Sequence, residues 1–127
     1  MRLSIIVPTL NEAANIAATL APLQPMRARG VEVIVADGGS ADATRAIAQP
    51  FADHLIDSVP GRARQMNAGA GVASGDTLLF LHADSLLPEG ADLEIAASLT
   101  QSQWGRFDVT IRGTHAMLPV VAWFMNH

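Results

Sequence analysis

The chain has 127 residues and a formal net charge of −4, which indicates one domain without the basic field that nucleic-acid binding requires. It contains no cysteine, which excludes disulfides, thiolate zinc sites, iron–sulfur clusters and a cysteine nucleophile. All 8 basic residues are arginine, so P-loop NTPases and pyridoxal phosphate enzymes, which need a lysine, are excluded as well.

Apolar, β-branched runs alternate along the chain with segments of helical periodicity. The predicted strands are residues 3–7, 31–36, 54–57, 77–81 and 104–111. The predicted helices are residues 13–23, 41–49, 62–73 and 91–101, with a last helix from Ala116 onward. We expect Asn11 to cap the first helix and Ser40 to cap the second.

This order predicts a mostly parallel sheet covered on both faces, that is, a three-layer α/β/α Rossmann-like fold. Ligands of such sheets bind beyond the carboxyl ends of the strands. Polar residues follow three predicted strands, namely Thr9, Asn11 and Glu12, then Asp37 to Ser40, then His82, Asp84 and Ser85. The chain has no GxGxxG after its first strand and no GxSxG, which disfavours a dinucleotide-binding domain and an α/β-hydrolase.

Two segments of the chain, one after the second predicted strand and one at the start of a predicted helix, have the chemistry of a nucleotide site. Asp37 could accept hydrogen bonds from a base or a ribose, and Gly38 would let the backbone approach a ligand; the alternative is a tight turn with an Asx cap. Arg62 and Arg64 fall in the first turn of a predicted helix, where the macrodipole disfavours cations. A bound diphosphate would explain them, and the alternative is a solvated basic face.

The segment after the fourth predicted strand has the chemistry of a metal site. Asp84 suits Mg²⁺ or Mn²⁺ shared with phosphate oxygens, because these ions prefer oxygen ligands. His82 could be a second ligand or a hydrogen-bond donor to the substrate. The alternative for His82 and Asp84 is a capped turn.

Three segments together resemble family 2 glycosyltransferases: Pro8-Thr9-Leu10-Asn11-Glu12, residues 36–44, and His82-Ala83-Asp84. The resemblance covers essentially the whole chain and implies the nucleotide-binding half of the A-type glycosyltransferase fold. Residues 61–69 and 104–108 resemble a bacterial subgroup found near radical-SAM and selenium-related genes.

The resemblance implies inverting transfer of a sugar from a nucleotide-diphosphate sugar, bound with Mg²⁺ or Mn²⁺, to an unknown acceptor. It places these residues at the donor: Pro8, Thr9, Glu12, Asp37, Gly38, Arg62, Arg64, Asn67, His82, Ala83 and Asp84. Asp84 matches the second carboxylate of the family's Asp-x-Asp signature and is the expected metal ligand. His82 stands where the family has the first carboxylate.

Residues 1–103 would form the nucleotide-sugar-binding part, and residues 104–127 the start of an incomplete acceptor part. Because members of the family continue further, the resemblance implies a C-terminally truncated chain whose general base is absent. Asp108 is the late carboxylate that could deprotonate an acceptor hydroxyl. Donor binding is therefore expected to survive better than transfer.

Two other functions remain open from the sequence. One is a non-catalytic nucleotide-binding or partner-dependent fragment, associating through Trp104, Phe107, Trp123 and Phe124. The other is a nucleotidyltransferase, which the missing glycine-rich basic loop after the first strand disfavours. No run reaches the ~20 apolar residues that span a bilayer. We therefore expect a cytoplasmic protein, with residues 116–125 as a peripheral contact to the inner face of the membrane, a lipid-linked acceptor and a homo-oligomer as options.

Overall fold

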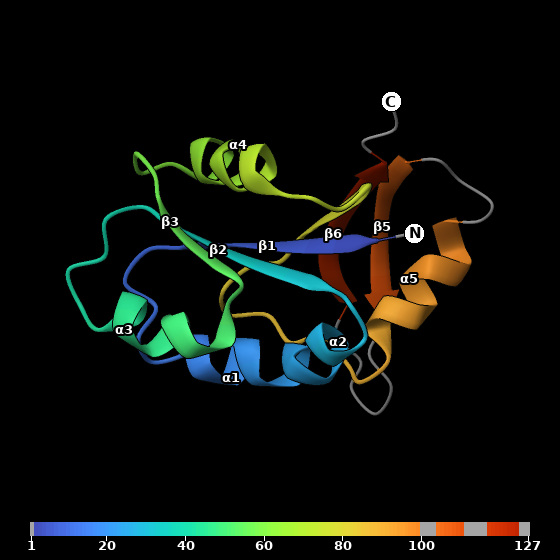
Figure 1. Ribbon diagram of the computed structural model, residues 1–127, viewed down its shortest axis with the longest axis horizontal. Coiled ribbons are helices and arrows are strands. Elements are labelled where there is room, and N and C mark those ends of the chain that lie inside the picture. The colour runs from blue at the N-terminus through green and yellow to red at the C-terminus, as the bar shows by residue number, and fades with distance from the viewer. Residues whose placement is uncertain (1, 100–103, 111–116, 125–127) are drawn as a thin grey trace.

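The computed structural model describes residues 2–99, 104–110 and 117–124. They form a 6-stranded sheet with the order β3-β2-β1-β4-β6-β5 (Figure 1). The strands are β1 (Leu3–Thr9), β2 (Glu32–Asp37), β3 (His54–Asp57), β4 (Thr77–Phe80), β5 (Trp104–Thr110) and β6 (Met117–Phe124). The helices are α1 (Ile16–Leu20), α2 (Gln24–Ala28), α3 (Thr44–Ala48), α4 (Arg62–Val72) and α5 (Ala91–Leu99), with 3₁₀ turns η1 (Ala21–Leu23) and η2 (Gln49–Phe51).

Strands β1 to β4 are parallel, which confirms the predicted α/β fold. β1 pairs with β2 on one side and with β4 on the other, and β3 extends the sheet beyond β2. The register places Thr9 opposite Asp37 and Ile6 opposite Phe80. The polar residues that follow β1, β2 and β4 therefore meet at one edge of the sheet.

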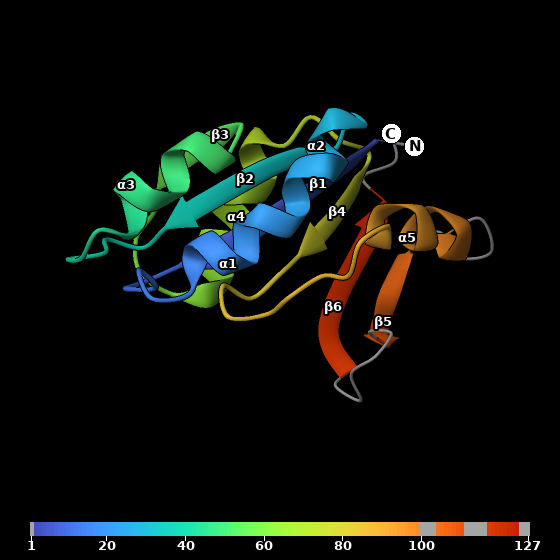
Figure 2. The same ribbon diagram turned by 90° about the horizontal axis from the view of Figure 1, so that it is seen from below.

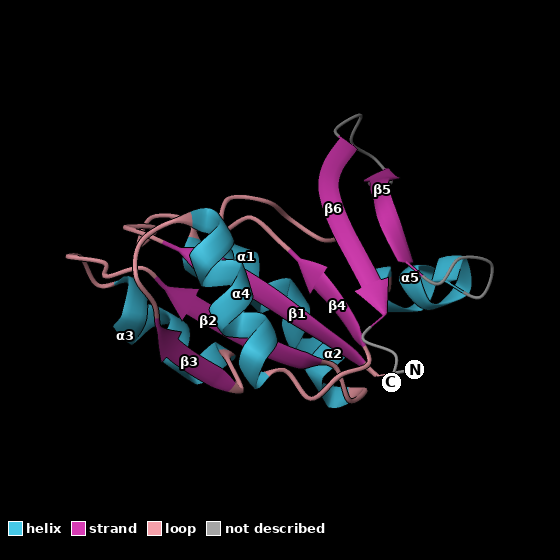
Figure 3. Cartoon of the chain, turned by 90° about the horizontal axis from the view of Figure 1, so that it is seen from above, coloured by secondary structure: helices cyan, strands magenta, loops and turns pink. Residues whose placement is uncertain are grey.

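The two faces of the sheet are covered by different helices. Helices α1, α2 and α3 lie on one face, as Figures 1 and 2 show, and α4 lies on the other, as Figure 3 shows from above. The larger core packs alternate β1 residues such as Ile5 and Val7 against Leu20 of α1. On the α4 side, a Cβ atom on Gly69 would lie 2.5 Å from Ile6 Cγ2, so α4 lies directly on β1.

The predicted helix from Ala116 onward is wrong, because residues 117–124 form β6. β6 runs antiparallel to β4, from Thr77 opposite Phe124 to Phe80 opposite Val121, and β5 runs antiparallel to β6. A Pro119 inside the segment disfavours a helix, and valine and aromatic residues favour a strand. A strand needs a hydrogen-bonding partner, and the free edge of β4 provides one for residues 117–124.

The predicted helix caps are also wrong. α1 begins at Ile16 and α3 at Thr44, several residues after the expected caps. Asn11, with φ of 54°, accepts a hydrogen bond from Ala41 N at 2.8 Å, and its own N–H donates to Ser40 Oγ at 2.8 Å. These side chains therefore join the β1–α1 loop to the β2–α3 loop.

None of the helices in the described part of the chain is long and apolar enough to cross a membrane.

Candidate functional site

A cavity of about 290 Å³ opens at the carboxyl edge of β1 and β4. Its walls come from the end of β1, the first turns of α4 and the segment after β4. The lining residues are Pro8, Thr9, Leu10, Glu12, Gly61, Arg62, Gln65, His82, Ala83 and Asp84. The cavity therefore brings together much of what the sequence analysis placed at a donor site.

The cavity lies where β1 and β4 separate. β1 pairs with β2 as far as Thr9, but its pairing with β4 stops at Ile6. Leu81 N still donates to Ile6 O at 2.9 Å, and Pro8, two residues further on, faces the same side of β1. Because proline has no N–H, β1 leaves no unpaired donor in this wall. β1 is the topological switch point of the parallel strands, because β2 and β3 were added on one side of it and β4 on the other. Ligands of open α/β sheets bind at such points.

Asp37 lies buried beside the cavity and is not part of its lining. Its Oδ1 accepts hydrogen bonds from Thr9 Oγ1 at 2.9 Å and from Ser40 Oγ at 2.6 Å. Its Oδ2 accepts from Gly39 N at 3.1 Å and from Ser40 N at 2.8 Å. Burial raises the pKa of Asp37, but these hydrogen bonds outweigh it and hold the pKa below its ordinary value. The carboxylate thus shapes the turn after β2 and orients Thr9, which does line the cavity.

Glu12 lines the cavity from the β1–α1 loop, which is hydrogen-bonded to the segment between β2 and α3 and to the start of α3. Glu12 N donates to Thr44 Oγ1 at 2.8 Å, and Ala13 N donates to Asp42 Oδ2 at 3.2 Å. Hydrogen bonds from the hydroxyl and the N–H of Thr44 hold the pKa of Asp42 below its ordinary value. These contacts add to the bonds of Asn11, so the β1–α1 loop is held in one conformation at the cavity rim.

The three residues predicted on α4 are not all at the cavity. Arg62 lines it, whereas Arg64 and Asn67 are exposed and do not. Gly61, with φ of 137°, precedes the helix without a side-chain cap. Arg62 forms no ion pair with any residue that the structure describes. Arg62 therefore places an unpaired positive charge at the cavity. It lies at the N-terminus of α4, and a helix N-terminus itself attracts anions.

His82, Ala83 and Asp84 all line the cavity opposite α4. Ser85 N closes a turn on His82 O at 3.0 Å, and Thr19 Oγ1 of α1 donates to Ala83 O. The turn is therefore anchored to the core beneath it. Asp84 is exposed, and within the described part of the chain its carboxylate has neither a hydrogen bond nor an ion pair.

The described residues contain no group of three or more acidic or histidine side chains that could hold a metal by themselves. Mg²⁺ is usually bound in proteins by one or two carboxylates together with phosphate oxygens, rather than by an all-protein cage. The cavity is lined by two carboxylates, Glu12 and Asp84, together with Arg62, which fits that kind of shared site.

Sequence analysis missed Gln65 as a site residue. Gln65 lines the cavity and is only 4% exposed, and its amide bonds to Thr9 O and Ala36 O. A helical signal could have found it, because Gln65 lies four residues before Gly69 and so shares its helix face. Both residues are buried against the sheet.

The residues predicted at the C-terminal end cannot be placed at the cavity. Asp108 lies on β5, opposite Pro119 of β6, and its side chain is outside the described part of the structure. The same is true of the four aromatic side chains expected at an association surface, Trp104, Phe107, Trp123 and Phe124.

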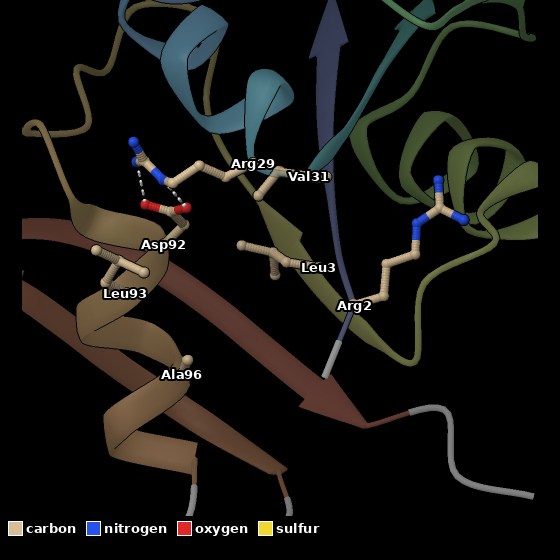
Figure 4. Close-up of a pocket in the computed structure, with 8 residues that line it drawn as sticks. Arg2, Leu3, Arg29, Val31, Asp92, Leu93 and Ala96 are labelled. Atoms are coloured by element: carbon tan, nitrogen blue, oxygen red, sulfur yellow. Dashed lines mark hydrogen bonds and ion pairs between the residues drawn. The ribbon is translucent and has the colours of Figure 1, made fainter.

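A larger cavity, of about 460 Å³, lies at the opposite edge of the sheet, between the start of β1, the α2–β2 connection and α5 (Figure 4). There Arg29 donates to both oxygens of Asp92, at 2.7 and 3.0 Å, and Arg2 extends away from this pair. The charges of Arg29 and Asp92 neutralise each other. This edge of the sheet carries the amino ends of β1 and β2. The smaller cavity is therefore the candidate site, because ligands bind at the carboxyl ends of parallel strands.

Comparison with known proteins places the chain in a family. A curated glycosyltransferase of PGL/p-HBAD biosynthesis from Mycobacterium tuberculosis is 39% identical over 102 residues, which are 75% of this chain and 40% of the relative. The mannosyltransferase PcManGT from Pyrobaculum calidifontis, solved with GDP-Man and Mn²⁺, is 25% identical, with a TM-score of 0.71 over 82% of this chain and 34% of its own.

Staphylococcus aureus TarS, solved with UDP-GlcNAc, is 24% identical and shares the fold, with a TM-score of 0.69 over 91% of this chain and 37% of its own. The chain spans only part of these proteins, and it covers 40% of the length of the mycobacterial relative. The family model for glycosyl transferase family 2 matches residues 4–111. The chain therefore belongs to glycosyl transferase family 2.

Proposed function

We propose that this chain binds a nucleoside diphosphate sugar in the cavity between β1, α4 and the turn after β4, as the donor site of an inverting glycosyltransferase. One observation carries the proposal: the unpaired cation of Arg62 and the unpaired carboxylate of Asp84 line the same polar cavity at the switch point of the sheet. A diphosphate with a divalent cation has the charges that satisfy both.

Each side chain has a task in this proposal. Arg62 and the N-terminal amides of α4 bind phosphate oxygens, and Pro8, Thr9 and Glu12 line the nucleoside. His82 and Ala83 face the ribose or the sugar from the opposite wall. Asp37 and Gly38 form the turn behind Thr9, and Arg64 and Asn67 occupy the outer surface of α4, where they contribute long-range charge and polarity.

Asp84 would hold the divalent cation, with phosphate oxygens completing its coordination. The Mn²⁺ found with GDP-Man in the Pyrobaculum mannosyltransferase supports Mn²⁺, and Mg²⁺ has the same ligand preference. A bound cation would neutralise charge on the departing nucleoside diphosphate. The chain's own part is to orient the diphosphate between Arg62 and Asp84.

Transfer also needs an acceptor and a general base. We assign residues 1–103 to the donor and residues 104–127 to the beginning of the acceptor part, with Asp108 as the sequence's candidate for the base. Because the donor site rests on described side chains, donor binding is the first activity to test.

Several finer assignments belong to the same proposal. The resemblance of residues 61–69 and 104–108 supports the radical-SAM-associated subgroup. The reaction would take place in the cytoplasm. A contact of residues 116–125 with the inner face of the membrane would be made by β6, which is paired with β4 and β5, and not by the helix expected from the sequence. A lipid-linked acceptor and a homo-oligomer are consistent with that position.

The test is a calorimetric titration of UDP, GDP, CDP and dTDP, each with and without Mn²⁺, into protein whose folding has been checked by circular dichroism. We expect one nucleotide to bind, and to bind more tightly with Mn²⁺. If no nucleotide binds to the folded protein, the donor-site proposal is wrong, and a partner-dependent fragment becomes the better description.

A further inference from the structure

Gln65 connects three segments of the chain through one buried amide. Its Nε2 donates to Thr9 O at 2.8 Å and to Ala36 O at 2.9 Å, at the ends of β1 and β2. Its Oε1 accepts a hydrogen bond from Gly61 N at 3.1 Å, immediately before α4. Both donor hydrogens of the amide are therefore used, so the side chain, although it lines the cavity, has no donor left for a ligand.

The turn after β2 is fitted closely around this amide. Gly38 is buried and donates from its N–H to Thr9 O at 2.9 Å, so Thr9 O accepts from both Gly38 and Gln65. A Cβ atom on Gly38 would lie 2.8 Å from Gln65 Oε1 and 2.9 Å from its Cδ. The position of the amide is therefore restricted by packing as well as by hydrogen bonds.

Gln65 also holds the first turn of α4 through its backbone. Gln65 N donates to Gly61 O at 2.8 Å, so Gly61 is bonded to the same residue through both its N–H and its C=O. This turn carries two arginines and no acidic residue, and its N-cap residue, Gly61, has no side chain to accept from the free N–H groups, so it is locally unfavourable. The attachment to β1 and β2 compensates for that and keeps Arg62 beside the strand ends.

We infer that Gln65 is a positioning residue, which sets the distance between Arg62 and the strand ends and so holds Arg62 where a diphosphate can bind. The inference rests on the proposed donor site. It makes Gln65 act through Arg62 rather than by touching the nucleotide. Loss of the amide should therefore weaken nucleotide binding only while Arg62 is present.

The chain contains a matched control for the loss of such an amide. Gln24 of α2 donates from Nε2 to Leu20 O and Phe51 O, both at 3.0 Å, and its Oε1 accepts from Arg27 Nη1 at 2.8 Å. It thus has the same number of bonds as Gln65. Its helix, α2, lies on the face of the sheet opposite to α4 (Figure 1), and Gln24 is not among the residues that line the cavity.

The experiment compares Gln65→Met with Gln24→Met, because methionine keeps the length of the side chain and removes the amide. The affinity is measured by calorimetry with Mn²⁺ for whichever of UDP, GDP, CDP and dTDP binds to the wild type. The temperature is kept well below the Tm of each variant. We expect Gln65→Met to bind about tenfold more weakly, which corresponds to about 1.4 kcal/mol, and Gln24→Met to bind like the wild type.

A double-mutant cycle with Arg62→Ala tests the route of the effect. We expect the double variant Gln65→Met/Arg62→Ala to bind no more weakly than Arg62→Ala alone. Full additivity, or wild-type affinity in Gln65→Met, would overturn the inference. If the wild type itself binds no nucleotide, it is the proposed function that fails, so the two failures are distinguishable.

A second variant covers the case in which Gln65→Met does not fold. Gly38→Ala keeps the Gln65 side chain but adds a Cβ atom that would lie too close to Gln65 Oε1. The substitution should therefore displace the Gln65 amide and also weaken nucleotide binding. Folded Gly38→Ala protein with wild-type affinity would count against the positioning role of Gln65.

Discussion

Gly38 and Gln65 approach each other so closely that a Cβ atom on Gly38 would lie 2.8 Å from Gln65 Oε1. The adjacent Gly39 has a different requirement, because its φ is 98° and no atom lies within 4 Å of a Cβ placed there. The two neighbouring glycines are therefore needed for separate reasons, the first for space and the second for backbone conformation.

Alanine at these two positions should respond differently to the loss of Gln65. Gly38→Ala should lower the free energy of unfolding by about 1–3 kcal/mol through overpacking, and Gly39→Ala by about 1–2 kcal/mol through the left-handed backbone. In a Gln65→Ala background, the cost of Gly38→Ala should shrink, whereas that of Gly39→Ala should not. Urea unfolding of the single and double variants measures both. An unchanged cost for Gly38→Ala in that background would show that the contact with Gln65 is not its cause.

Asp84→Asn should remove the Mn²⁺-dependent part of nucleotide affinity, because asparagine has no charge to offer a cation. Asp76→Asn is the control, since Asp76 is also exposed but precedes β4, at the opposite edge of the sheet. Calorimetry with and without Mn²⁺ measures the difference. Mn²⁺ dependence that persists in Asp84→Asn would assign the cation to another residue of the cavity.

Arg62→Ala and Arg64→Ala should not be equivalent, although the two residues are in the same helical turn. Arg62 lines the cavity and Arg64 does not. A hydrogen bond to a charged group contributes about 1.5–3 kcal/mol, so Arg62→Ala should lower nucleoside diphosphate affinity by about 10- to 100-fold. Arg64→Ala should change it much less. Equal losses in a titration would mean that the donor extends along the outer surface of α4.

Glu32 should make the protein sensitive to acid. It is 5% exposed, accepts from Ser4 Oγ and Ser74 N, both at 2.8 Å, and from Ser74 Oγ at 3.0 Å, and lies 3.3 Å from His54 Nε2. Burial raises its pKa, but the hydrogen bonds from Ser74 and Ser4 outweigh this and hold the pKa below its ordinary value of 4.5. The stability that Glu32 contributes is therefore present above pH 4.5 and lost as the pH falls through the lowered pKa.

The comparison is between the wild type and Glu32→Gln, by urea unfolding from pH 7 downward. Glu32→Gln should be less stable at pH 7 and should show a shallower loss of stability below pH 4.5, because it cannot be protonated. Glu94→Gln, at an exposed position of α5, controls for the removal of one charge. Parallel curves for the wild type and Glu32→Gln would contradict the role of this carboxylate.

The sequence by itself determined the parallel sheet and the edge of the sheet at which the candidate site lies. Runs such as Ile5–Val7 and Leu78–Leu81 are short and apolar without interruption, as is typical of strands that are buried on both faces of a parallel sheet. Parallel strands all end at the same edge, so the polar residues after them had to meet there. The cavity containing Thr9, Arg62 and Asp84 follows from that rule.

Only the tertiary structure decided the features that depend on contacts between distant segments. Pro119 and the valine and aromatic residues of 117–124 favour a strand, but the pairing of this segment with the free edge of β4 is a contact between distant parts of the chain. Asn11 joined the β2–α3 loop instead of capping a helix. Gln65 was fixed by carbonyls 56 and 29 residues away in the chain. Local periodicity specifies which residues are buried, but the partner of a buried polar group is chosen by the packing of the whole domain.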